Sequence, residues 1–239
     1  MLTKMNDAMM NALNIKLNPF REEIRDLVNS MEYMNSRFED ISKEHKYTQE
    51  QVAILVKENE HLKTTVSDLS NRIDHMEQHS RSKNIEIQCV PENKNENLLN
   101  MVLQLTGAIG SEVNESHILN CTRVAKMRRE GNRPRSIIVE LCTPRYRDEF
   151  LTCALKYNKL NSRQKLNSTI IGISGNPVPI YICEHLSPTN KALHAAARMK
   201  AKQHKYKFVW VRNGRIFVRK NEESQFLWIK NTCSLDKII

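Results

Sequence analysis

An unbroken seven-residue repeat of apolar side chains over residues 24–76 constrains this 239-residue chain more than any other feature. With Ile24 at the first core position, thirteen of the sixteen core positions through Met76 are apolar, in a chain that is 40% hydrophobic. No Pro or Gly falls between Phe20 and Ser80. A helix with such a strict 3.5-residue seam cannot bury it alone, so the pattern predicts a coiled coil. The alternative is one amphipathic helix packed on the chain's own globular part.

The start of this helix is also marked in the sequence. Asn18 can cap a first turn, and Pro19 suits the first helical position, where its missing N–H costs no hydrogen bond. The sequence therefore predicts an N-terminal segment at 1–18 and a coiled coil over 19–80. Apolar residues further upstream keep the same face, which leaves a short preceding helix open.

Residues within the seam bear on how many chains associate. Asn59 at a core position, and β-branched residues that alternate with Leu, favour a parallel dimer. The stretch Arg72–Glu77 instead matches the Arg-h-x-x-h-Glu pattern of trimeric coiled coils, in which h is apolar. We expect a parallel homo-oligomer and leave dimer and trimer open. The residues assigned to self-association are Ile24, Leu27, Val52, Leu55, Asn59, Leu62, Val66, Leu69, Arg72, Ile73, Met76 and Glu77.

Charge separates the coil from the rest of the chain. Residues 1–80 carry 10 Lys and Arg against 14 Asp and Glu, whereas residues 81–239 carry 27 against 13. This basic rear part predicts a polyanionic partner, with nucleic acid the first candidate and an acidic membrane surface the second.

Several protein classes are excluded by what the sequence lacks. No run approaches the roughly 18 apolar residues of a membrane span, and the N-terminus lacks the apolar core of a secretory signal. The six cysteines form no C-x-x-C pair, so we expect reduced thiols in an intracellular protein rather than disulfides or a zinc site. The motifs G-x-x-x-x-G-K-[ST], H-E-x-x-H and G-x-S-x-G are also missing. We therefore expect a protein that is not an enzyme, with no catalytic residues, cofactor or metal.

An α+β pattern follows the coil. Alternating apolar residues predict strands at 85–89, 118–127 and 137–141, and helical spacing predicts helices at 98–105 and 144–157. The order β-α-β-β-α is typical of ferredoxin-like, RNA-recognition-like domains.

One more strand would complete this domain. Either Ile170-Ile171 or Ile180–Cys183 can supply it. Pro177, the first of two closely spaced prolines, marks a boundary. The sequence thus predicts an RNA-recognition-like domain at 81–176 and a small basic strand-helix-hairpin module at 177–239.

Asn213-Gly214 is the strongest hairpin signal in the chain. A two-residue turn there sets Arg212 opposite Arg215 and Trp210 opposite Phe217. The valines of both strands then share the core face, while the aromatic rings and three arginines share the other face. Such a face is suited to stack bases and contact phosphates. The alternative buries the rings beneath the preceding helix.

Two further basic patches accompany the hairpin. A helix over 189–204 places basic residues on one face, opposite Ala192, Ala196 and Met199. The loop between the second and third predicted strands carries more arginines. Together these patches predict an interface for single-stranded RNA or DNA. The residues assigned to it are Arg123, Lys126, Arg128, Arg129, Arg133, Arg135, Lys191, Arg198, Lys202, Lys205, Trp210, Arg212, Arg215, Phe217 and Arg219.

Four short pieces carry a family resemblance: the strand Ile180-Tyr181-Ile182, the helix start Leu186–Thr189, the hairpin Trp210–Arg215 and the exit Arg219–Glu222. They resemble the C-terminal domain of the baculovirus few-polyhedra (FP) protein family, and related domains of insect retroelement-derived proteins. The whole layout is similar to the first open-reading-frame protein of LINE-type retrotransposons.

These resemblances imply two functions. The LINE resemblance implies an oligomeric, chaperone-like protein that binds RNA or single strands. The FP resemblance implies a late viral protein linked to nucleocapsids, envelope-protein trafficking and occlusion. The strands at 85–89 and 137–141 lack the aromatic residues on which RNA-recognition domains stack bases. We expect a self-associating nucleic-acid-binding protein of the cytoplasm, nucleus or virion. The alternative is a structural or trafficking adaptor that binds proteins through its coil.

Overall fold

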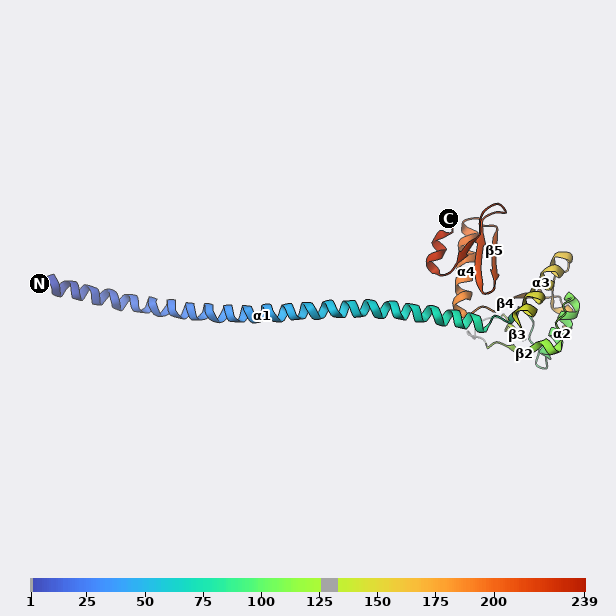
Figure 1. The fold of residues 1–239 in the computed structure, drawn as a ribbon, viewed down its shortest axis with the longest axis horizontal. Helices are drawn as coiled ribbons and strands as arrows, with labels where there is room; N and C mark the ends of the chain where they lie inside the picture. The colour runs from blue at the N-terminus through green and yellow to red at the C-terminus, as the bar shows by residue number, and fades with distance from the viewer. Residues whose placement is uncertain (1, 126–132) are drawn as a thin grey trace. The chain divides into compact units, whose positions relative to one another are not determined.

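The computed structural model describes residues 2–125 and 133–239 (Figure 1). A single long helix, α1 (Leu2–Ser80), begins the described chain. It confirms the long predicted helix, but the predicted start is wrong, because Pro19 lies inside the helix. The residues before Pro19 are mostly good helix formers and include no Gly. They extend the helix through Pro19 at the loss of one backbone hydrogen bond.

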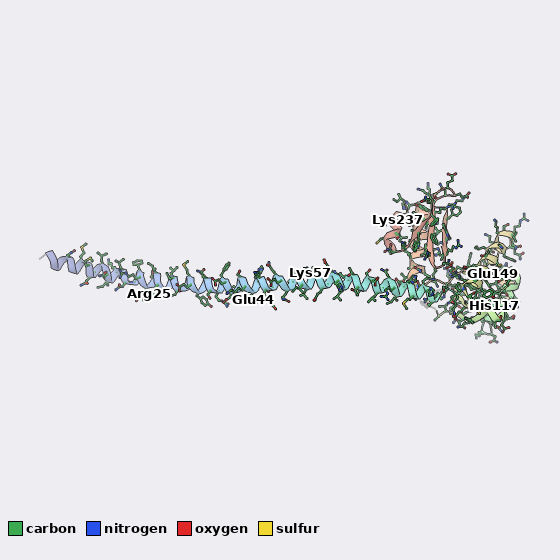
Figure 2. All side chains as sticks on the ribbon, in the orientation of Figure 1. Arg25, Glu44, Lys57, His117, Glu149 and Lys237 are labelled. Atoms are coloured by element: carbon green, nitrogen blue, oxygen red, sulfur yellow. The ribbon has the colours of Figure 1, made fainter. Side chains whose placement is uncertain are left out.

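The chain divides into two compact units, Met1–Leu69 and Ser70–Ile239. The described part of the first unit consists of α1 residues up to Leu69, and the last turns of α1 belong to the second unit. The side chains of the first unit project on all sides of the helix, as Figure 2 shows for Arg25, Glu44 and Lys57.

The thirteen apolar core positions from Ile24 to Met76, called the apolar seam below, are exposed along α1. Their exposed fractions run from 48% at Leu69 to 74% at Phe38. Within α1 itself nothing buries these side chains, and apolar side chains left in water are costly.

The second unit begins with a four-stranded antiparallel sheet in the order β2-β3-β1-β4, with helices α2 and α3 packed on one face. The core alternates along the strands through Ile85, Ile87, Val139 and Leu141, and Phe150 of α3 is fully buried against it. Its elements are β1 (Asn84–Gln88), α2 (Leu98–Ile109), the 3-10 helix η1 (Glu115–His117), β2 (Ile118–Arg123), β3 (Ile137–Leu141), α3 (Pro144–Leu160), the 3-10 helix η2 (Ser168–Ile171) and β4 (Tyr181–Glu184).

Strand pairing settles which segment completes this sheet. β4 pairs with β1, whereas Ile170-Ile171 lies in η2. The strand that the sequence analysis assigned to the C-terminal module therefore belongs to the first sheet. β2 ends at Arg123 rather than at residue 127, because its partner β3 begins directly opposite, at Ile137. Residues 126 and 127 lie outside the described residues.

The C-terminal part of the second unit has its own core beneath a three-stranded antiparallel sheet, in the order β5-β6-β7. β5 and β6 pair in the register predicted from Asn213-Gly214. The third strand, β7, was not predicted. The elements are α4 (Pro188–Gln203), β5 (Phe208–Arg212), β6 (Arg215–Arg219), β7 (Leu227–Ile229) and the 3-10 helix η3 (Thr232–Lys237).

The buried face of α4 differs from the predicted one. Leu193, Ala197 and Ala201 are buried at i, i+4 and i+8, whereas Met199 is 67% exposed. The small Ala197 lets the helix approach Ile216 and the other core residues of the sheet, while Leu193 fills the core. The predicted opposite face through Ala192, Ala196 and Met199 is therefore wrong.

The hairpin tip is held by side chains from three other segments of the second unit. The two carboxylate oxygens of Glu184 accept the backbone N–H groups of Asn213 and Gly214, at 2.8 and 2.6 Å. Arg147, 3% exposed, donates to Asn213 Oδ1 at 2.5 Å. Gln78 lies against Gly214, where an added Cβ would fall 2.6 Å from Gln78 Cγ. Asn213 and Gly214 have positive φ, 52° and 70°. This backbone conformation favours glycine at position 214.

We predict that Gly214→Ala destabilises the second unit more than Gly110→Ala does. Both glycines have φ near 70°, but only Gly214 faces a close neighbour. The backbone strain alone costs about 1–2 kcal/mol, and displacing Gln78 adds to it, because Gln78 hydrogen-bonds Ser187 and Asn190. Urea denaturation of both variants measures the difference. Gln78→Ala should recover part of the loss in G214A; equal losses in G214A and G110A would contradict the contact.

Candidate nucleic-acid interface

The face of the C-terminal sheet turned away from its core gathers aromatic rings. Side chains alternate along a strand, so the rings of β5 and β6 lie on the side opposite the buried Ile216 and Val218. Trp210 and Phe217 stack with ring centroids 5.5 Å apart. Phe226 packs edge-on against Phe217 at 5.6 Å, and β7 places Trp228 directly opposite Phe217.

Cations lie over the outer rings of this cluster. Arg215 Cζ and Lys230 Nζ lie 4.9 and 4.2 Å from the centre of the Trp228 ring. Lys207 Nζ and Arg219 Cζ lie 5.2 and 5.3 Å from the centre of the Phe208 ring. Such distances are those of cation–π contacts. The side chains of Lys207, Phe208, Trp210, Arg212, Arg215, Phe217, Arg219, Trp228 and Lys230 are called the basic aromatic face below.

The exposure of the rings decides between the two readings of the hairpin. Trp228 is 39% exposed, and Phe208, Trp210 and Phe217 are partly buried. α4 packs on the other side of the sheet, against Ile216 and its neighbours. The alternative in which the preceding helix covers the rings is therefore wrong, and the rings present accessible surface.

Sequence reasoning missed Trp228 and Lys230. β7 is only three residues long, too short for a clear alternation pattern. The one available signal was Trp228 between two aliphatic residues, with Lys230 directly after them. That pattern is typical of a short strand with its aromatic residue outward.

The four Lys and Arg residues that the sequence assigned to the interface in and just after α4 divide into two groups. Arg198, Lys202 and Lys205 are exposed. Lys191 instead lies 2.8 Å from the carboxylate of Glu86, which is itself 3% exposed. Lys191 is therefore engaged within the second unit, whereas the other three point to solvent.

The geometry of this segment can now be set beside known proteins. Residues 187–239 match the family model of Baculovirus FP protein domain 2. The match confirms the predicted FP resemblance for this segment, which covers 53 of the 239 residues and includes α4 and all three strands of the C-terminal sheet. No curated protein matches the chain.

The segment matched to FP domain 2, residues 187–239, contains most of the candidate interface. It carries 12 Lys and Arg against 3 Asp and Glu. In the part of the chain that the structure describes, no cluster of three or more His, Cys, Asp or Glu side chains suits a metal ion. Within those same residues, no helix is both long and apolar enough to cross a membrane.

Arg123, which lies outside the segment matched to FP domain 2, is buried and paired within the fold. Its side chain is 4% exposed and lies 2.5 Å from the Glu96 carboxylate. It also donates to the backbone oxygens of Val90, Pro91 and Arg135. These contacts leave almost no surface for a phosphate, because the guanidinium is already surrounded by acceptors.

The remaining residues of the predicted loop patch are placed as follows. Arg135 pairs with Glu92 at 3.0 Å and is 41% exposed, while Arg133 is exposed. Lys126, Arg128 and Arg129 lie outside the described residues. Of the described residues of this patch, Arg123 and Arg135 are thus paired with carboxylates.

The outer face of the four-stranded sheet differs in character from the basic aromatic face. Glu86 and Ile138 lie at its centre and are 3% and 9% exposed. Cys183 lies beside Glu86, and burial raises the pKa of its thiol to about 12. Tyr181 is exposed at the end of β4. Among the described residues this face thus offers one exposed ring, Tyr181, and its cations Lys83 and Lys191 are paired with Glu140 and Glu86, in contrast to the ring cluster of the basic aromatic face.

We predict that Arg123→Met lowers the free energy of unfolding by about 3 kcal/mol at pH 7, because it leaves the Glu96 carboxylate unpaired. The hydrogen bond from Arg123 holds the pKa of Glu96 below 4.5 in the folded chain. That stabilisation is present above pH 4.5 and is lost as pH falls through the lowered pKa, so the gap between variant and wild type narrows in acid.

Denaturation at pH 7 and below pH 4 measures this gap. Arg135→Met is the matched control, and loss of its half-exposed pair should cost much less. An R123M variant of normal stability but reduced affinity for single-stranded RNA would show instead that Arg123 is a surface contact.

Proposed function

We propose that this chain is a self-associating protein that binds single-stranded RNA or DNA through the basic aromatic face. One observation carries the proposal: cations cap the rings of Phe208 and Trp228 on an accessible sheet face. Single-strand binding combines base stacking on aromatic rings with cations that follow the phosphate backbone.

The four-stranded sheet supports an RNA-recognition-like interpretation. Its element order is β-α-β-β-α-β, with β1 between β3 and β4. Since its outer face has no cluster of rings among the described residues and its cations are paired with carboxylates, we propose that this module positions the C-terminal one rather than stacking bases. Because β4 closes the first sheet, we place the start of the C-terminal module at Ser187, where the FP domain 2 match also begins.

Self-association is the second part of the proposal. The apolar seam is exposed along α1, and a second copy in parallel would bury it. Each chain brings one basic aromatic face, so two or three chains raise the effective affinity for a long strand without any new contact. The FP domain 2 match supports a viral origin, and we propose that the protein acts inside the cell or in the virion.

We predict that the chain binds single-stranded RNA with a steep salt dependence, measured by fluorescence anisotropy. Each phosphate contact contributes about 0.7 to the slope of log affinity against log salt. Arg212→Ala with Arg215→Ala should therefore reduce the slope by about 1.4. The control replaces Lys156 and Lys159, two exposed cations of α3, by Ala. No binding at low salt by a folded chain would overturn the proposal and favour the adaptor function.

We predict that Leu62→Glu with Leu69→Glu dissociates the oligomer, measured by sedimentation velocity. Glu keeps the helix propensity of Leu but cannot be buried in the apolar seam without a partner charge. The matched control, Thr64→Glu with Ser67→Glu, adds the same charges off the seam and should sediment as wild type. Identical sedimentation of both double variants would contradict association through the seam.

A further inference from the structure

A hollow of about 390 Å³ lies beside the first strand of the C-terminal sheet. It is lined by Lys207, Phe208, Val209, Trp210 and Arg219. β5 is an edge strand, so one side of the hollow has no neighbouring strand. The hollow therefore combines two aromatic rings and two cations at an open edge.

The spacing of the two rings suits one planar base. Phe208 and Trp210 are two residues apart on one strand face, which separates them by about 6.8 Å along the strand. This is twice the roughly 3.4 Å step between neighbouring nucleotides in a stacked strand. Trp210 stacks on its cross-strand partner Phe217 with ring centroids 5.5 Å apart, so its ring is fixed before a ligand arrives.

The two cations are placed to meet a phosphate. Arg219 is fixed by its own loop, because Nε donates to the oxygen of Asn221 and Nη2 to that of Glu222. Its Nη1 makes no hydrogen bond to the described residues. Lys207 pairs with the Glu222 carboxylate at 2.6 Å, but both side chains are more than half exposed. An exposed pair of this kind is weak, so a phosphate can compete for Lys207.

We propose that this hollow is a subsite for one nucleotide, with the base against Phe208 and Trp210 and the phosphate between Lys207 and Arg219. The inference rests on the proposed function and names the place where a single strand is bound. The ligand chemistry is a planar base joined to a phosphate, which a polynucleotide and a free nucleotide both supply. A duplex is excluded from the subsite because its bases are already stacked and paired.

The test uses the fluorescence of Trp210. The chain has two tryptophans, so Trp228→Phe leaves Trp210 as the single reporter. In this full-length background we titrate an eight-nucleotide oligouridylate, uridine monophosphate and an RNA duplex. The subsite predicts strong quenching of Trp210 by the oligonucleotide, weaker binding of the monophosphate and no quenching by the duplex.

Three further variants in the same background test whether the oligonucleotide binds in this hollow. Phe208→Leu removes the ring but keeps an apolar side chain, and should weaken oligonucleotide binding about tenfold. Glu222→Gln frees Lys207 and should tighten binding up to about fivefold. Tyr181→Leu removes an exposed ring from the first sheet and should bind as the background does. Thermal melting confirms that each variant is folded.

The possible failures are distinguishable. If the oligonucleotide binds F208L as tightly as the background and leaves Trp210 unquenched, the subsite is wrong and the proposed function stands. If the monophosphate binds as tightly as the oligonucleotide, the hollow is a free-nucleotide site and the strand-gripping inference is overturned. If no oligonucleotide binds the wild-type chain, both the subsite and the proposed function fall.

Discussion

The register of one hairpin decides which side chains of the C-terminal sheet meet solvent. The Asn213-Gly214 turn fixes that register, and the Glu184 carboxylate holds the turn through both of its backbone N–H groups. A slip by one residue would exchange the two faces, placing valines outside and arginines in the core. The basic aromatic face therefore depends on a turn that carries none of its rings or cations. It also depends on a carboxylate from the last strand of the other sheet.

The features predicted correctly from sequence are those that neighbouring residues determine. The long helix follows from a repeat within one segment, and the hairpin register follows from a two-residue turn. Three features missed by the prediction depend on distant partners. The pairing of Arg123 with Glu96, 27 residues earlier, is invisible to a local pattern. The buried face of α4 and the short β7 are likewise selected by a core that assembles from separate segments.

Counting charges in a window cannot separate a binding surface from an internal ion pair. Arg123 and Arg135 fall in a basic stretch, yet carboxylates from an earlier loop pair with both. The segment at 187–239 is different because its 3 acidic residues are too few to pair with all of its 12 basic ones. Arg215 and Arg219 lie over aromatic rings instead, where they keep their charge available at the surface. The two patches thus differ in how many carboxylates lie close to their cations, although both patches consist of Lys and Arg.

The exposed seam is unfavourable in a single chain, and a single basic aromatic face is expected to bind a strand only weakly. A single helix leaves thirteen apolar side chains in water, and one face with a few cations binds a strand weakly at physiological salt. Association through the seam would remedy both, because burying it brings several faces onto one strand. Binding and association are then linked: a strand that contacts two faces favours the oligomer, and the oligomer favours the strand. The acidic helix and the basic C-terminal module suit this proposed division of labour, since a polyanion would be attracted to the module and not to the helix.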